Sequence, residues 1–171
     1  PIVKEMGVGS GKQLFVDDCI IEEAQNVTRV VNQVTKYEGN PILRVDKPWE
    51  RSICHATVIG NKKDGFKMWY WIVGVPSATG TTIHEDYRIC YATSKDGINW
   101  EKPPLELFEF QGSKRNNVVL ERKEMPNIIY QPQDPNPSRV YKMFFFEMRD
   151  SKEHGSLARY KGYGISFSPD G

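Results

Sequence analysis

Two polar stretches of the sequence place carboxylates next to aromatic and arginine residues. The first reads Trp49-Glu50-Arg51 and the second reads Glu147-Met148-Arg149-Asp150. Two carboxylates that flank a glycosidic bond can act as general acid and as base or nucleophile, while an aromatic ring and planar hydrogen-bonding groups hold the sugar. Carbohydrate chemistry is one use that these residue types allow. They make Glu50, Glu147 and Asp150 the candidate catalytic residues.

The candidate substrate-binding residues combine rings, guanidinium groups, amides and a carboxylate on polar stretches: Trp49, Arg51, His55, His84, Asp86, Asn117 and Arg149. Trp49 is the expected stacking platform. A structural ion pair is the rival interpretation of Arg149 and Asp150, because an arginine beside a carboxylate often does no more than pair with it. The spacing of His55, His84 and His154 matches no compact metal-ligand pattern, so neither a metal nor another cofactor is expected.

Composition limits the class of protein and of partner. Of the 171 residues, 39% are apolar and 26% charged, which is typical of a soluble globular chain. The net charge of +1 gives no general attraction to nucleic acid, and no apolar run is long enough to span a membrane. The three cysteines, Cys19, Cys54 and Cys90, are far apart, as expected of buried free thiols.

A repeated pattern of aromatic strands positions these residues. Residues 66–73 are an aromatic run, 87–93 a second strand, and 94–100 a turn that reads Ser-x-Asp-Gly-x-x-Trp. A weaker copy follows in residues 141–146 and 162–171. Repeated all-β units of this length are typical of propeller blades. We therefore predict an all-β fold with about two four-stranded antiparallel blades.

The strands of the first blade are expected at residues 55–60, 66–73, 87–93 and 101–110. The second blade has its second and third strands at 140–147 and 160–167. Its inner strand is either 116–120 or 127–131. Polar loops are expected at 76–86 and 148–159.

Four segments divide the chain. Residues 1–12 are a leader, 13–54 hold N-terminal strands and a connection, 55–110 form the first blade, and 111–171 form a second blade that is incomplete at its C-terminal end. Residues 13–22 suit two short strands split by a carboxylate pair, and 23–34 suit a strand at least as well as a helix. The sequence stops inside the second copy of the turn, which indicates a fragment of a longer protein.

The turn motif has a structural role. The side chain of Asp96 can accept backbone N–H bonds, Gly97 can adopt a left-handed conformation, and Trp100 can fold back to pack between sheets. The acidic residues at this turn and at the hairpins are therefore poor catalytic candidates.

Several motifs occur in an order that resembles bacterial relatives of the five-bladed β-propeller glycoside hydrolases of families 32, 43 and 68. They are Leu14-Phe15-Val16-Asp17-Asp18, Asn40-Pro41-Ile42-Leu43, Lys47-Pro48-Trp49-Glu50, Lys67-Met68-Trp69-Tyr70 and the run from Tyr91 to Trp100. The resemblance covers most of residues 13–171. It implies a five-bladed propeller, of which this chain holds about two blades, and a secreted or periplasmic glycosidase whose general acid lies in a later blade.

Propeller geometry brings residues 46–55, 76–86, 112–127 and 148–159 to one face, and the turns at Asp64, Asp96 and Asp134 to the other. Enzymes of the resembled group usually carry an aspartate at the start of the first inner strand. Residues 51–56 contain none, and the nearest carboxylates are Asp46 and Glu50. Two functions stay open, a glycoside hydrolase that uses a carboxylate pair and a non-catalytic glycan-binding or scaffold propeller. The expected partners are an oligosaccharide or polysaccharide, and the missing blades of its own chain or a second copy.

Overall fold

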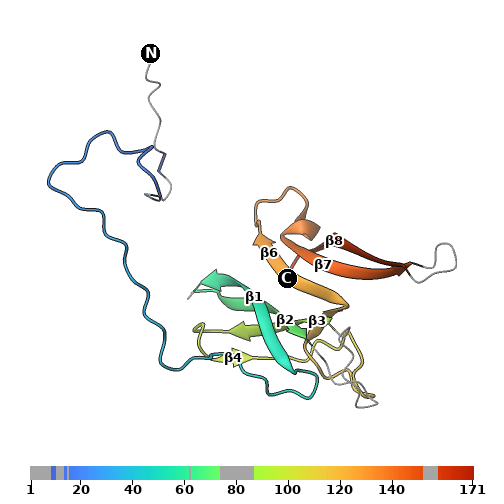
Figure 1. Cartoon of the computed structure of the whole chain (residues 1–171). Helices are drawn as coiled ribbons and strands as arrows, with labels where there is room; N and C mark the ends of the chain where they lie inside the picture. Colours follow the sequence, from blue (N-terminus) through green and yellow to red (C-terminus); the bar gives the residue numbers. More distant parts are fainter. Residues whose placement is uncertain (1–8, 11–13, 15, 62, 74–86, 152–157) are drawn as a thin grey trace. The chain divides into compact units, whose positions relative to one another are not determined.

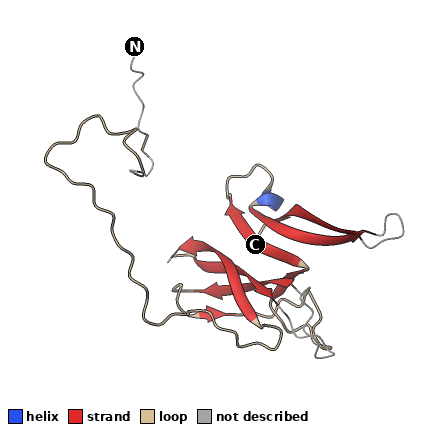
Figure 2. Cartoon of the chain, viewed as in Figure 1, coloured by secondary structure: helices blue, strands red, loops and turns tan. Residues whose placement is uncertain are grey.

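The computed structural model describes residues 9–10, 14, 16–61, 63–73, 87–151 and 158–171, with the backbone only at 61, 148–151 and 158–161. The chain divides into two units, residues 1–37 and 38–171. Within the described residues the fold is all-β and antiparallel, and a single short 3₁₀ turn is its one helical element (Figure 2).

The N-terminal unit forms no strand in its described residues, so the prediction of two short strands in residues 13–22 is wrong there. The carboxylate pair makes a turn instead, because Asp17 Oδ1 accepts the backbone N–H of Cys19 at 3.0 Å and Asp18 pairs with Arg29. Residues 23–34 also lack regular structure. Their valines are exposed, as at Val31, where 77% of the residue is accessible.

The first sheet of the second unit has five strands. They are β1 (Ser52–Asn61), β2 (Gly65–Val73), β3 (Tyr87–Ser94), β4 (Trp100–Glu101) and β5 (Val118–Glu121). β2 lies between β1 and β3, and both β4 and β5 pair with the outer edge of β3. The predicted strands at 55–60, 66–73 and 87–93 are confirmed.

The outer edge of this sheet differs from the prediction. Only Trp100 and Glu101 are strand, because Pro103 and Pro104 supply no N–H for a ladder. The rest of the segment packs irregularly on the sheet through Phe108 and Phe110. The edge is completed by β5, so the first sheet continues past residue 110 to Glu121, and residues 116–120 do not start the second sheet.

The second sheet contains β6 (Lys123–Tyr130), β7 (Tyr141–Ser151) and β8 (Ala158–Ser168), in that order. The 3₁₀ turn η1 (Pro137–Arg139) lies between β6 and β7. Of the two segments predicted as the first strand of the second blade, 116–120 and 127–131, the second lies almost wholly in β6. β7 and β8 are longer than predicted, because their pairing continues to Ser151 and Ala158, and this places Arg149 and Asp150 in a strand instead of a loop.

Both faces of the first sheet are covered, which explains why β2 is apolar on both sides. Met68, Tyr70 and Ile72 pack on one face, where Leu43, Trp49, Phe108 and Phe110 cover them. Trp69 belongs to the other cluster, together with Ile89 of β3 and three residues of the second sheet: Ile128, Met143 and Phe145. Figure 1 shows the second sheet lying against the first.

The two Ser-x-Asp-Gly turns share the hydrogen bonds of their serine side chain. Ser94 Oγ lies 3.0 Å from Asp96 Oδ1 and accepts the N–H of Gly97 at 2.8 Å. Ser168 repeats both contacts, with Asp170 at 2.8 Å and with the N–H of Gly171 at 2.9 Å. Gly97 has a φ of 77°, as the motif requires. The repeat predicted from the sequence therefore extends to the hydrogen bonds of the turn.

The first turn predicts a specific acid response. The backbone N–H groups of Asn99 and Ile98 hold the pKa of Asp96 below its ordinary value of 3.8. A depressed pKa in the folded state stabilises the fold above that ordinary value, and the stabilisation is lost as the pH falls. Asp96→Asn should lower Tm at neutral pH and flatten its fall between about pH 4 and pH 2.

Thermal unfolding followed by circular dichroism across this range tests the prediction. Glu109→Gln is the matched control, since Glu109 is an exposed carboxylate with no partner among the described residues. Parallel Tm profiles for Asp96→Asn and the parent chain would contradict it.

Candidate functional site

The strand ends define two ends of the second unit. At one, called here the loop end, β1, β3 and β6 begin and β2 and β7 end. Arg122, the residue between β5 and β6, is held to the start of β3, because Arg122 N donates to Tyr87 O at 2.7 Å. The other, called the turn end, holds the hairpin after β1, the turn of Asp96 and the connection from Tyr130 to Tyr141. Asp64, Asp96 and Asp134 lie at the turn end.

The first strand of each sheet, β1 and β6, has an irregularity near the loop end. The register of β1 shifts between Cys54 and Ala56, where His55 has a φ of 42°. The register of β6 shifts between Glu124 and Asn127, where Met125 has a φ of 51°. A hydrogen bond of 2.8 Å from Thr57 Oγ1 to Pro126 O joins the two strands here. Bulges and left-handed backbone at non-glycine residues are concentrated at functional sites.

Three rings line the loop end of the first sheet. The ring centroid of His55 lies 5.5 Å from that of Trp71, and Trp71 lies 5.7 Å from Tyr87. His55 is exposed, since its bulge turns it out of the strand pairing. The Trp71 Nε1 atom is buried and has no hydrogen-bond partner among the described residues. The arrangement offers an aromatic surface with an unused donor.

Charged residues of the loop end are paired across strands. Arg88 Nε lies 3.0 Å from Glu121 Oε1, and Lys123 contacts the carboxylate of Glu147. Glu147 is buried, with 5% of the residue exposed. Glu124 is also buried, and its charge adds to the effect of burial in raising the pKa of the Cys54 thiol. Arg88 and Lys123 thus neutralise the carboxylates of Glu121 and Glu147.

Three of the predicted site residues meet inside the molecule instead of on an open face. Glu50 Oε1 accepts from Tyr70 Oη at 2.7 Å, and Glu50 Oε2 accepts from Lys102 Nζ at 2.7 Å. Tyr70 Oη accepts from Asn117 Nδ2 at 2.7 Å, and Asn117 Oδ1 accepts from Trp49 Nε1 at 2.9 Å. The side chain of Glu50 is 0% exposed. These five residues are called the Glu50 network.

The Glu50 network joins two irregular segments to the first sheet. Trp49 and Glu50 come from the segment before β1, while Lys102 and Asn117 come from the segment between β4 and β5. Burial raises the pKa of the Tyr70 hydroxyl, so it stays a neutral donor and acceptor between Glu50 and Asn117. Both oxygens of Glu50 are hydrogen-bonded, to Tyr70 and to Lys102, which explains how a carboxylate is tolerated in the core.

The remaining predicted residues are dispersed. Arg51 is exposed immediately before β1. Arg149 and Asp150 pair through their backbone with Tyr160 and Arg159 of β8. His84 and Asp86 lie outside the described residues.

Sequence reasoning missed four loop-end residues: Trp71, Tyr87, Lys123 and Glu124. Trp71 and Tyr87 are strand-terminal aromatic residues next to the expected polar loop, and this position was a usable signal. The charged run Glu121-Arg122-Lys123-Glu124 was a weaker one, because it looks like a solvated turn.

Comparisons with protein-family models, with curated proteins and with solved structures found no match. Among the described residues, no three His, Cys, Asp or Glu side chains gather as a metal site would require. The described part of the chain also holds no helix with the length and hydropathy needed to cross a membrane.

Proposed function

We propose that the chain binds an oligosaccharide or polysaccharide at the loop end. The observation that carries this proposal is the ladder of His55, Trp71 and Tyr87, in which the indole N–H of Trp71 has no hydrogen-bond partner within the described residues. Aromatic rings stack on the C–H faces of sugars, and a buried donor without a partner suits a sugar hydroxyl. The ion pair of Lys123 with Glu147 adds a charged group at the same end of the unit.

We further propose that the two sheets are neighbouring blades of a propeller. When the strand copies are aligned on Lys67 and Lys142, Phe144 takes the place of Trp69. Alignment of the Ser-x-Asp-Gly turns likewise places Tyr163 where Ile89 stands. Trp69 and Ile89 are the residues through which the first sheet packs on the second. The second sheet thus carries, on its outward face, the residues needed to pack on another blade.

Binding is favoured over hydrolysis because two of the predicted catalytic carboxylates, Glu50 and Glu147, are buried and paired. Glu50 is enclosed in its network, and Glu147 is paired with Lys123. A nucleophile or general base needs an open approach to the substrate, which neither residue has. The absence of an aspartate from residues 51–56 agrees with this preference.

A glycoside hydrolase is the second candidate, because two buried carboxylates, Glu124 and Glu147, stand in successive pairs of the β6–β7 ladder at the loop end. Glu147 pairs with Lys123, and the next residue of β6, Glu124, pairs with Phe146. Glu124 and Glu147 are 7% and 5% exposed. With Asp150 at the end of β7, they are the candidate acid and base on this alternative. The resemblance to secreted or periplasmic glycosidases supports the same alternative.

Isothermal titration with neutral oligosaccharides tests the binding proposal. Trp71→Phe keeps a ring but removes the N–H, so it should weaken binding about three- to tenfold, the value of one hydrogen bond. Tyr163→Phe is the matched control, because it also removes one hydrogen-bonding group from an aromatic ring, at a residue that is 88% exposed and outside both proposed sites. Equal losses in both variants, or none in either, would contradict a site at the ladder.

Release of reducing sugar from the same oligosaccharides distinguishes the two functions. If the chain hydrolyses them, Glu147→Gln and Asp150→Asn should abolish release. If it only binds them, the parent chain releases none.

A further inference from the structure

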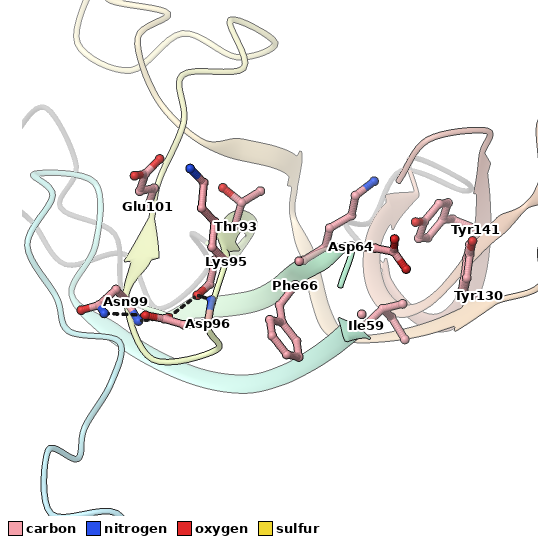
Figure 3. A pocket seen from close by; sticks show the side chains of 14 residues that line it. Ile59, Asp64, Phe66, Thr93, Lys95, Asp96, Asn99, Glu101, Tyr130 and Tyr141 are labelled. Carbon is pink, nitrogen blue, oxygen red and sulfur yellow. Dashed lines mark hydrogen bonds between the residues drawn. The ribbon is translucent and has the colours of Figure 1, made fainter. Parts of the chain in front are cut away.

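A pocket of about 550 Å³ opens at the turn end, away from the ladder of the loop end (Figure 3). It lies where the hairpin after β1, the end of β3 and the Asp96 turn meet two tyrosines of the second sheet. Its lining is Ile59, Gly60, Asp64, Gly65, Phe66, Lys67, Thr93, Ser94, Lys95, Asp96, Asn99, Glu101, Tyr130 and Tyr141. Nothing in the proposed function uses this pocket.

The aromatic wall of the pocket is held in place. The ring centroids of Tyr130 and Tyr141 lie 4.8 Å apart, at an interplanar angle of 34°. Tyr141 also lies 5.8 Å from Trp69, and the Lys67 Nζ atom lies 4.7 Å from its ring centroid. Tyr130 is 46% exposed. A fixed ring pair with one half-exposed member needs little ordering when a flat ligand stacks on it.

The polar wall carries unused hydrogen-bonding groups. Figure 3 shows Thr93, Lys95 and Glu101 extending side by side, while Asp64 lies next to the two tyrosines. Within the part of the chain that the structure describes, no hydrogen bond or ion pair occupies Lys95 or Glu101. Asp96 is different, because its oxygens accept the N–H groups of Ile98 and Asn99. The donors and acceptors on offer are therefore those of Lys95, Glu101 and Thr93.

We propose that this pocket is a second carbohydrate site, in which one pyranose ring of an oligosaccharide stacks on Tyr130 while the hydroxyls of a further sugar unit bond to Lys95 and Glu101. Rings with equatorial hydroxyls present flat C–H faces to an aromatic surface and polar groups at their rim. The carboxylates of Asp64, Asp96 and Glu101 oppose a phosphate or another anion. The charged rim likewise disfavours a purely apolar ligand.

The test is a titration of the ¹⁵N-labelled chain with a β-1,4-linked glucotetraose, whose hydroxyls are all equatorial. The amides of Gly60 and Gly65 line the pocket and report on it, while the Trp71 indole N–H reports on the loop end. We expect saturable shifts of both glycine amides. If the loop-end proposal fails and this one holds, the glycine amides move while the Trp71 indole stays in place.

Two variants assign the binding to the pocket. Tyr130→Ala should weaken it about tenfold, in line with the loss of a stacked ring. Lys95→Ala, at an exposed turn residue, should weaken it about threefold through one lost hydrogen bond. Tyr163→Ala is the control, since Tyr163 is an exposed tyrosine of the same sheet outside the pocket. Glycine amides that do not move, unchanged affinity in Tyr130→Ala, or equal shifts with a mononucleotide would overturn the proposal.

Discussion

Glu50→Ala should lower the free energy of unfolding by about 2–4 kcal/mol, because buried donors lose their acceptor. The substitution removes the carboxylate that lies 2.7 Å from the Lys102 ammonium, in a side chain that is 4% exposed, while Asp46 Oδ1 remains 2.6 Å away. It also removes the acceptor of the Tyr70 hydroxyl. Urea unfolding followed by circular dichroism measures the change.

Two further variants show whether the loss comes from the network. Tyr70→Phe breaks the link between Glu50 and Asn117 and should cost about 1–3 kcal/mol, because polar groups are left without a partner. Glu109→Gln, at an exposed carboxylate, should change little. A loss of less than about 1 kcal/mol in Glu50→Ala, the range of an exposed pair, would contradict the structural role. Glu50 would then be available for the catalytic role that the sequence suggests.

The regular strands were predictable because their patterns are strong. Residues 66–73 combine aromatic and β-branched side chains with a glycine turn in front, and β2 occupies Gly65–Val73. β3 likewise matches the prediction at 87–93. The turn chemistry of Asp96 and Gly97 was equally readable, because local hydrogen bonds fix it.

The edge of the first sheet was not predictable from local pattern. Residues 101–110 contain apolar residues at strand-like spacing, but Phe108 and Phe110 pack on the face of the sheet instead of extending its edge. β5 then pairs with β3 across a long connection, and no local signal specifies that pairing. β-propensity measures how well a segment fits a half-buried sheet surface. Tertiary contacts, which the local sequence does not encode, determined that β5 and not residues 103–110 pairs with β3.

The candidate site shows the same limit. Propeller geometry predicted Glu50 beside Trp49 on a ligand face, but the sequence does not say which way an irregular segment turns its side chains. Lys102 and Asn117, far along the chain, determine that Glu50 is enclosed. His55 was named from the sequence. Its bulge and its stacking on Trp71 depend on the register of two strands, which only the structure gives.

The outward face of the second sheet predicts self-association of this chain. Tyr163 is 88% exposed, and Phe144, Ile165 and Phe167 are 41%, 44% and 44% exposed. These four residues alternate along β7 and β8 with residues that pack inward, so they share one face. An apolar face of this kind marks an interaction surface, and β8 is an edge strand among the described residues. Light scattering should show an apparent mass of a dimer or more that rises with concentration.

Charged substitutions distinguish association through this face from non-specific hydrophobic association. Phe144→Lys with Ile165→Lys should return the chain to the mass of a monomer, because two ammonium groups on a sheet face oppose burial. Val31→Lys with Val34→Lys is the matched control, since both valines are more exposed than Phe144 but belong to the N-terminal unit. If the control also yields a monomer, or the parent chain is a monomer at every concentration, the face does not drive association. If only Phe144→Lys with Ile165→Lys yields a monomer, this face drives association, as the blade proposal requires.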